Sequence, residues 1–102
     1  MPAKRALIMH PDDNVATAVE EIASGEEVRI PVGTSFRTLA AAEAIPFGFK
    51  IALADIPRKA VIVKYGETIG TAGIPIAKGT LVHIHNLEGT RARGDLEKGG
   101  AQ

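Results

Sequence analysis

Hydrophobic residues change their spacing along the chain, and each spacing predicts a different element. A short apolar run at residues 6–9 predicts a first strand. The polar residues 12–14 follow Pro11 and are typical helix caps. The next apolar residues share one helical face: Val15, Ala18, Val19 and Ile22. Because Gly25 would end such a helix, the pattern predicts one principal helix between the first strand and Gly25.

Most of the remaining apolar residues alternate with polar ones, which predicts strands. Val28, Ile30 and Val32 alternate in this way, and so do Ile51 and Leu53. Residues 61–63 and 81–85 are compact, mostly β-branched runs. Residues 38–44 are ambiguous, because their alanines favour a helix that the following proline would stop. The predicted fold class is therefore mainly β with one principal helix, in a single domain.

A short pattern recurs three times with identical spacing. Its copies are Ile22-x-x-Gly25-x-x-Val28, Ile76-x-x-Gly79-x-x-Val82 and Ile56-x-x-Lys59-x-x-Ile62. Each copy predicts an apolar anchor, a tight turn with positive φ at its third step, and entry into a strand. The irregular distance between the copies argues against a solenoid.

The length and composition exclude several classes of protein. A chain of 102 residues without cysteine is too short for a Rossmann enzyme with a substrate domain. It also has no thiolate for a zinc site, an iron–sulfur cluster or a cysteine nucleophile. No apolar run is long enough to span a membrane, and the run at residues 6–9 is too short for a signal peptide. These features predict a cytoplasmic protein with no membrane contact.

The charges balance overall but not along the chain. The 12 basic and 12 acidic residues give zero net charge, which argues against a nucleic-acid partner. Residues 1–43 carry four basic and seven acidic side chains, whereas residues 44–87 carry five basic and two acidic ones. The middle segment therefore either faces an anionic ligand or is simply an exposed charged surface.

Two histidines lie two positions apart in the strand predicted at residues 81–85. His83 and His85 would then point to the same face, where two imidazoles can bind a metal or an anion. The alternative is that they are ordinary exposed residues on a wet sheet face. Asn86 follows them and offers both a donor and an acceptor.

Two further groups of polar residues are candidates for ligand binding. His10 and Asn14 lie at the start of the predicted helix, where an anion is favoured, although plain helix capping also explains this turn. Lys50 and Lys64 lie at strand ends and can bind a carboxylate or simply extend into water. Tyr65 is the only tyrosine and either belongs to this site or covers the edge of the core.

Several of these residues fall in blocks that resemble the altronate/galactarate dehydratase family. The blocks are Ile8-Met9-His10-Pro11-x-Asp13-Asn14-Val15-Ala16, Ile45-Pro46-x-Gly48-Phe49-Lys50-Ile51-Ala52-Leu53 with Asp55-Ile56, Val63-Lys64-Tyr65-Gly66 with Ile69-Gly70, Val82-His83-Ile84-His85-Asn86-Leu87 and Arg91-Ala92-Arg93-Gly94-Asp95. Together they cover about residues 8–95 in the family's order, which is far more specific than a lone motif. The chain is also similar to the small subunit of sulfolactate sulfo-lyase.

The resemblance implies a fold and an activity. It implies an SAF domain with a β-clip fold over residues 1–95, followed by a flexible tail at 96–102. It also implies the small subunit of a two-subunit lyase that completes the active site of a large dehydratase subunit. The reaction would remove water, or sulfite, from a sugar acid or hydroxy acid. A divalent metal, possibly Fe²⁺, would be held mainly by the large subunit.

Such an elimination needs a base, an acid for the leaving group and cations for the substrate carboxylate. We therefore assign His85 and His10 as catalytic candidates and His83 with His85 as metal candidates. The substrate-binding candidates are Asn14, Lys50, Lys64, Tyr65, Asn86 and Arg93.

The chain departs from the family pattern at two positions. Phe49 stands where the family usually has histidine, which puts the substrate or the activity itself in question. Lys59 stands where a turn glycine is usual, which predicts a local loop change. The alternative function is a non-catalytic module that binds acidic sugars or another protein.

Overall fold

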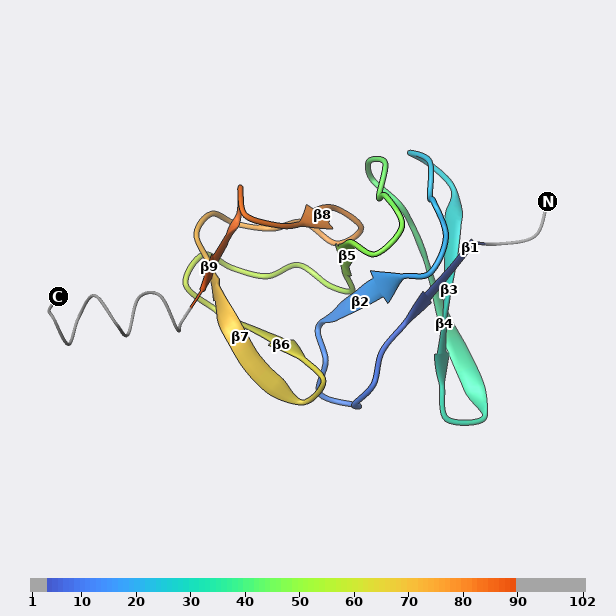
Figure 1. Cartoon of the computed structure of the whole chain (residues 1–102), viewed down its shortest axis with the longest axis horizontal. Coiled ribbons are helices and arrows are strands. Elements are labelled where there is room, and N and C mark those ends of the chain that lie inside the picture. The colour runs from blue at the N-terminus through green and yellow to red at the C-terminus, as the bar shows by residue number, and fades with distance from the viewer. Residues whose placement is uncertain (1–3, 90–102) are drawn as a thin grey trace, which may run out of the picture.

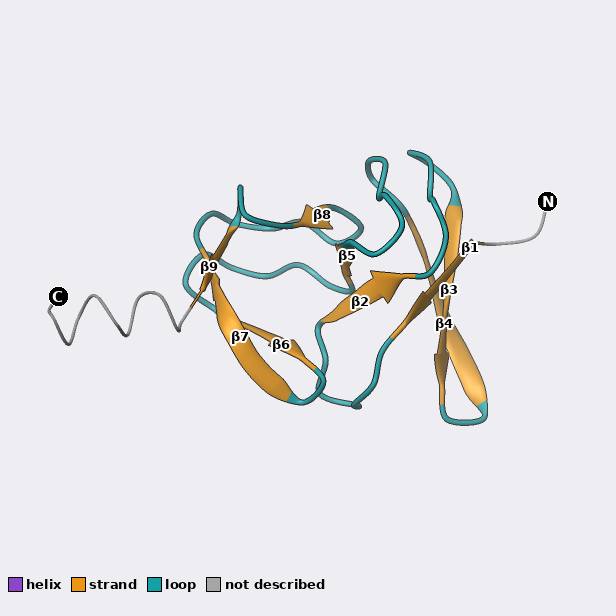
Figure 2. Ribbon diagram, viewed as in Figure 1, coloured by secondary structure: helices purple, strands orange, loops and turns teal. Residues whose placement is uncertain are grey.

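Strands make up the regular secondary structure of residues 4–89, the part of the chain that the computed structural model describes (Figure 2). The strands are β1 (Lys4–Leu7), β2 (Val15–Ala18), β3 (Glu27–Val32), β4 (Ser35–Ala40), β5 (Lys50–Ala52), β6 (Val61–Lys64), β7 (Glu67–Ala72), β8 (Leu81–Val82) and β9 (Leu87–Gly89). The mainly β prediction is thus confirmed, and residues 38–40 of the ambiguous segment lie in β4. Within these residues we find no helix able to cross a membrane.

The strands form two sheets. Six strands are ordered β4-β3-β1-β2-β5-β8, and three are ordered β6-β7-β9. Only β1 and β3 pair in parallel among the described strands. Figure 1 shows the β3–β4 hairpin at one end and the three-stranded sheet at the other, with β2, β5 and β8 between them.

The predicted principal helix is wrong, because its first residues form β2. This strand pairs with β1 on one side and with β5 on the other. Val15, Ala16 and Ala18 are all buried, so the strand shows no simple alternation of apolar and polar residues. Ile22, which extended the apparent helical spacing, is apolar because it forms a buried isolated β-bridge with Ile45. Pairing with distant strands therefore overrides a local pattern that matches a helix.

Four copies of one sequence pattern build the fold, one more than the three found in the sequence. The copies occupy residues 18–28, 41–51, 52–62 and 72–82. Each starts with a buried alanine, has a buried isoleucine four residues later and ends on a buried valine or isoleucine. The fourth copy contains Ile45-x-x-Gly48-x-x-Ile51, and the leading alanine is a further shared position.

The turn in each copy has the predicted backbone conformation. The φ angles are +86° at Gly25, +87° at Gly48, +73° at Lys59 and +86° at Gly79. In each turn the amide after this residue donates to the carbonyl three positions back, at 3.0–3.2 Å. A positive φ at the third turn position is the requirement of a type II turn. Lys59 therefore adopts the glycine-like conformation without being glycine.

The copies pair reciprocally through backbone hydrogen bonds. In the first pair, Ile22 and Ile45 exchange N–H···O bonds of 3.0 and 2.8 Å. The turn amide of Gly25 donates to Ala41, and that of Gly48 donates to Ala18. The second pair repeats this arrangement: Ile56 and Ile76 exchange bonds, Lys59 donates to Ala72 and Gly79 donates to Ala52. Each copy thus satisfies the buried backbone groups of its partner.

Each pair of copies packs its own hydrophobic cluster. The first pair contributes Ala18, Ile22, Val28, Ala41, Ile45 and Ile51 to one cluster. The second pair contributes Ala52, Ile56, Ile62, Ala72, Ile76 and Val82 to the other. Since copies two and three are consecutive in sequence, β5 joins the two clusters.

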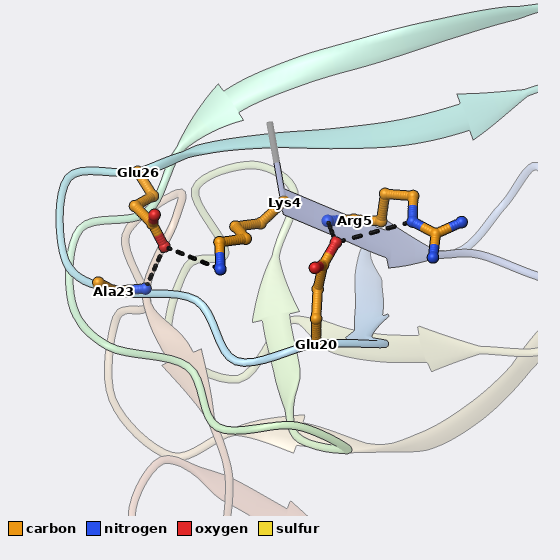
Figure 3. Close-up of polar contacts among 5 residues, drawn as sticks. All are labelled: Lys4, Arg5, Glu20, Ala23 and Glu26. Atoms are coloured by element: carbon orange, nitrogen blue, oxygen red, sulfur yellow. Dashed lines mark hydrogen bonds and ion pairs between the residues drawn. The ribbon is translucent and has the colours of Figure 1, made fainter. Parts of the chain in front are cut away.

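Two glutamates attach β1 to the loop that follows β2 (Figure 3). Glu20 accepts a 2.8 Å hydrogen bond from the backbone of Arg5 and lies 3.7 Å from its Nε. Glu26 accepts a 2.7 Å bond from the backbone of Ala23 and lies 4.0 Å from the ammonium of Lys4. Part of the acidic excess in residues 1–43 therefore serves to hold the fold.

The strained lysine turn gives a stability prediction. Replacing Lys59 by glycine removes the conflict between its Cβ and a left-handed backbone, so the free energy of unfolding should rise by about 1 kcal/mol. Urea unfolding followed by circular dichroism measures this change. The matched control is Lys78→Gly, one position earlier in another turn, where added chain entropy should lower stability instead. Equal effects at the two positions would contradict the prediction.

Candidate functional site

The β1–β2 loop carries His10 and lies between the tips of two hairpins. On one side, the imidazole ring of His10 packs against Gly66 in the β6–β7 turn, where an added Cβ would come within 2.8 Å of the ring. On the other side, His10 and Met9 line a cavity of about 220 Å³ with residues 31–33 of the β3–β4 hairpin. His10 thus packs against the β6–β7 turn on one side and faces a cavity beside the β3–β4 hairpin on the other.

Asp13 ties this loop to the β6–β7 turn. Its Oδ1 accepts a 2.8 Å hydrogen bond from the amide of Gly66, and its Oδ2 accepts a 3.0 Å bond from the amide of Met9. Burial by itself would raise the pKa of Asp13. The hydrogen bonds from backbone amides, led by that of Gly66, outweigh burial and hold the pKa below its usual value. The buried, ionised carboxylate therefore holds the β1–β2 loop to the β6–β7 turn, and we call it the Asp13 clamp.

Asn14 connects the same loop to β6. Its Oδ1 accepts a 2.8 Å bond from the amide of Val63, and its Nδ2 donates to the carbonyl of Val61 at 3.0 Å. The side-chain amide of this predicted substrate-binding residue is therefore engaged with backbone. Its geometry explains why the loop and β6 meet.

The β6–β7 hairpin turns on two residues with positive φ, Tyr65 at +58° and Gly66 at +74°. Two such residues in succession are the requirement of a type I′ turn, which suits Asn-Gly much better than Tyr-Gly. The turn leaves Tyr65 half exposed, with the Lys64 ammonium 4.7 Å from the centre of its ring. Tyr65 therefore adopts a strained backbone conformation, as Lys59 does in its own turn.

Lys50 brings a second ammonium group to this region. It lies on β5, paired with Thr17 of β2 and Val82 of β8, and is half-buried. Burial, and after it the charge of Lys64, lowers the pKa of Lys50. Within residues 4–89 neither lysine forms an ion pair with a carboxylate. Two cations whose charges act on each other, with no carboxylate paired to either, are suited to attracting an anion.

The two C-terminal histidines do not share a strand face. β8 ends at Val82, and residues 83–86 form a turn, so the predicted strand over 81–85 is too long. Asn86 closes this turn, since its Oδ1 accepts from the amide of His83 and its Nδ2 donates to the carbonyl of Leu81. His83 packs against Phe49 with ring centroids 4.6 Å apart, whereas His85 is exposed.

The structure thus assembles part of the predicted site. Lys64 lies over Tyr65, and its charge acts on Lys50, while His10 packs against Gly66 beside that tyrosine. The side chains of Asn14 and Asn86 are engaged with backbone. Arg93 and the predicted tail at 96–102 lie outside the described residues. The sequence analysis missed Asp13 as a buried clamp, for which its place beside His10 was the available signal.

The described residues of this chain do not fit a self-contained divalent metal site. No group of three or more His, Asp or Glu side chains is suitably placed within residues 4–89. A catalytic metal commonly takes three protein ligands, so His83 and His85 would be too few. His83 and His85 would therefore need further ligands from elsewhere to hold a divalent metal.

Comparison with known proteins gives a consistent set of relatives. Residues 4–90 match the model of the altronate/galactarate dehydratase SAF domain. The chain is 40% identical over 78 residues to the altronate dehydratase of Escherichia coli, covering 76% of this chain and 15% of that protein. It is 39% identical over 81 residues to the galactarate dehydratase (L-threo-forming) of the same organism, covering 79% of this chain and 14% of that protein.

A shorter relative matches almost end to end. The chain is 31% identical over 89 residues to the (2R)-sulfolactate sulfo-lyase subunit alpha of Chromohalobacter salexigens, covering 83% of this chain and 95% of that subunit. By contrast, the chain spans only about 15% of the length of the dehydratases.

The Asp13 clamp gives a pH-dependent prediction. Because its folded-state pKa is lowered, its ionised form stabilises the fold above the unfolded pKa of about 3.9, and this contribution is lost as the pH falls through the folded pKa. Asp13→Asn leaves a backbone N–H facing an amide N–H, so it should cost about 2 kcal/mol at pH 7, and the cost should fall as the pH is lowered from 7 to 2. Urea unfolding at both pH values measures the difference.

The adjacent carboxylate provides the control. Asp12 is exposed and accepts no backbone hydrogen bond within residues 4–89, so Asp12→Asn should change stability little at either pH. A cost of Asp13→Asn that does not depend on pH would contradict the assigned role.

Proposed function

Because this chain belongs to the altronate/galactarate dehydratase SAF domain family, we propose that it forms one part of a lyase whose larger part is another chain. Its substrate is a sugar acid or hydroxy acid that loses water or, as the sulfo-lyase relative suggests, sulfite. The observation that carries the proposal is a pair of lysines, Lys50 and Lys64, that have no carboxylate partner in residues 4–89, with Lys64 lying over Tyr65.

The chemistry of elimination fits this group. Removal of the proton next to a carboxylate builds negative charge on the carboxylate, so cations placed there stabilise the transition state. Lys50 and Lys64 supply those cations, and His10 lies at the neighbouring loop as a proton donor or acceptor. The amide of Asp12 donates to Nδ1 of His10 at 3.1 Å, so Nε2 is the ring nitrogen left to exchange a proton.

The relatives support a shared active site. The dehydratases that resemble it are several times longer, and the relative that matches end to end is named as a subunit. A large partner chain would supply the remaining catalytic groups and, as the family resemblance implies, most ligands of a divalent metal such as Fe²⁺. On this proposal the chain is inactive alone and acts as a small subunit. Its proposed location is the cytoplasm.

The anion site can be tested on the chain alone. Titration with galactarate, followed by amide chemical shifts, should perturb residues around Lys50 and the 64–66 turn. Lys64→Met should weaken binding about tenfold, because it removes a charge-assisted contact. Lys78→Met removes an equal charge at an exposed turn and should have little effect. Equal losses from both substitutions would show only general electrostatic attraction.

The catalytic role can be tested in a chimaera. The full chain replaces the matching segment of the Escherichia coli altronate dehydratase, and dehydration of altronate is measured. His10→Ala in the insert should lower kcat by about 10²-fold to 10⁴-fold. Phe49→His restores the residue usual in the family and should raise the rate of the chimaera if this departure limits it.

A matched pair of glycines separates positioning from stability. Gly66→Ala pushes on the His10 ring, whereas Gly25→Ala also places an alanine at positive φ, meets no atom within 4 Å and lies in another turn. Both substitutions should lower the stability of the chimaera, but only Gly66→Ala should lower its kcat relative to the unsubstituted chimaera. An active chimaera that is indifferent to His10→Ala and Gly66→Ala would refute the role of His10.

A further inference from the structure

The edge strands of the two sheets differ in how their outer backbone groups are treated. Among the described strands, the sheets end on β4 and β8 and on β6 and β9. The side-chain amide of Asn14 bonds one backbone N–H and one C=O of β6, and that of Asn86 does the same at the end of β8. β9 has three residues, whereas β4 has six and lies at the end of the molecule opposite the three-stranded sheet (Figure 1).

The register of the β3–β4 hairpin shows which backbone groups of β4 point outward. The amide of Ala41 donates to the carbonyl of Glu26, so these two residues form a hydrogen-bonded pair across the hairpin. Such pairs alternate along an antiparallel ladder. The residues of β4 whose N–H and C=O groups point away from β3 are therefore Phe36, Thr38 and Ala40.

Phe36 and Thr38 form the open part of this edge. The carbonyl of Ala40 is covered by Gly79, where an added Cβ would come within 2.5 Å of its oxygen. Phe36 and Thr38 are exposed, and no strand within residues 4–89 pairs with the outer side of β4. A row of unpaired N–H and C=O groups is a template for an added strand. The open edge therefore selects extended backbone as its ligand.

The charges beside the open edge are positive. Arg29 and Arg37 are the only charged side chains of residues 28–42, and neither pairs with a carboxylate within residues 4–89. The guanidinium of Arg29 lies over the ring of Phe36, 4.3 Å from its centroid. That of Arg37 lies on the other face of the hairpin and donates to the carbonyl of Leu53 at 3.3 Å. An added strand thus meets one guanidinium on each face.

A second copy of this chain fits the edge poorly. If two antiparallel copies of β4 both use the open groups of Phe36 and Thr38, Arg37 of one copy lies directly opposite Arg37 of the other. Like charges in this position destabilise a pair of strands, whereas opposite charges stabilise it. The same arginine that opposes self-pairing therefore favours a strand that carries carboxylates.

We propose that the outer edge of β4 binds an extended, acidic segment of another protein chain, which adds a strand to the six-stranded sheet. Backbone hydrogen bonds to Phe36 and Thr38 supply the affinity, and carboxylates that face Arg29 and Arg37 supply the selectivity. The inference concerns an interaction surface and does not rest on the proposed function.

A peptide titration tests the edge on the full chain. The probe is a capped peptide of alternating valine and glutamate, about seven residues long. At saturation it should slow hydrogen exchange at the amides of Phe36 and Thr38 about tenfold or more, while Arg37 and Leu39 are already protected by β3. A peptide of alternating valine and lysine should bind about tenfold more weakly. Unchanged exchange at Phe36 and Thr38 would overturn the interface, and equal binding of the two peptides would overturn its selectivity.

The backbone contact is tested by Thr38→Pro. Proline removes the outward N–H but no hydrogen bond to β3, so affinity for the glutamate peptide should fall about tenfold while the hairpin remains. Thr38→Val keeps the N–H and a β-branched side chain, so it should bind as the original chain does. Slow exchange at Arg37 and Leu39 verifies the hairpin in both variants. Equal affinities of the two variants would show that this edge is not the binding surface.

The charge contact is tested without altering the backbone. Arg29→Met should weaken binding of the glutamate peptide several-fold, whereas Arg58→Met removes an equal charge from an exposed turn and should have little effect. Equal losses would leave only general attraction and overturn the charge assignment. Protection of Phe36 and Thr38 that rises with the concentration of the chain alone would identify a second copy as the occupant and overturn the acidic partner.

Discussion

Reciprocal backbone pairing between copies of one short pattern is the constraint on which this molecule depends. Each copy presents a bridging isoleucine and a turn amide to its partner and receives the same in return. Five of the eight largest fully buried side chains of the described residues occupy repeated positions of the pattern, namely Val28, Ile45, Ile51, Ile62 and Val82. The β3–β4 hairpin starts where the first copy ends, and the β6–β7 hairpin starts where the third copy ends, so the pairing of the copies sets where these hairpins begin. The meeting of the β1–β2 loop with the β6–β7 turn is thus a consequence of how the copies interlock.

The sequence was informative where structure is local. Positive φ at Gly25, Gly79 and Lys59 follows from turn chemistry, which acts over four residues, and the prediction of these turns is confirmed. The helix prediction failed because β2 is defined by partners far away in sequence. For the same reason, Lys50 and Lys64 could be named separately, but their proximity depends on Asn14 joining β2 to β6. The roles of His85 and Arg93 stay predictions.

The charges of the chain are divided between two tasks. Carboxylates such as Glu20, Glu26 and Asp13 accept hydrogen bonds from backbone amides, so they are committed to holding loops in place. The ammonium groups of Lys50 and Lys64 are left without such partners within residues 4–89. A chain with zero net charge can therefore present a locally cationic surface, because its negative charges are used where loops need acceptors.

The duplicated architecture also has a consequence for how the site can change over evolutionary time. The long β3–β4 hairpin and the short β6–β7 hairpin leave equivalent positions of copies one and three, and their tips flank the same histidine loop. Either tip can change in length or sequence while the interlocked copies keep the frame unchanged. The two hairpin tips can thus vary independently on a frame that stays the same. New ligand preferences can arise at one tip without a change in the other.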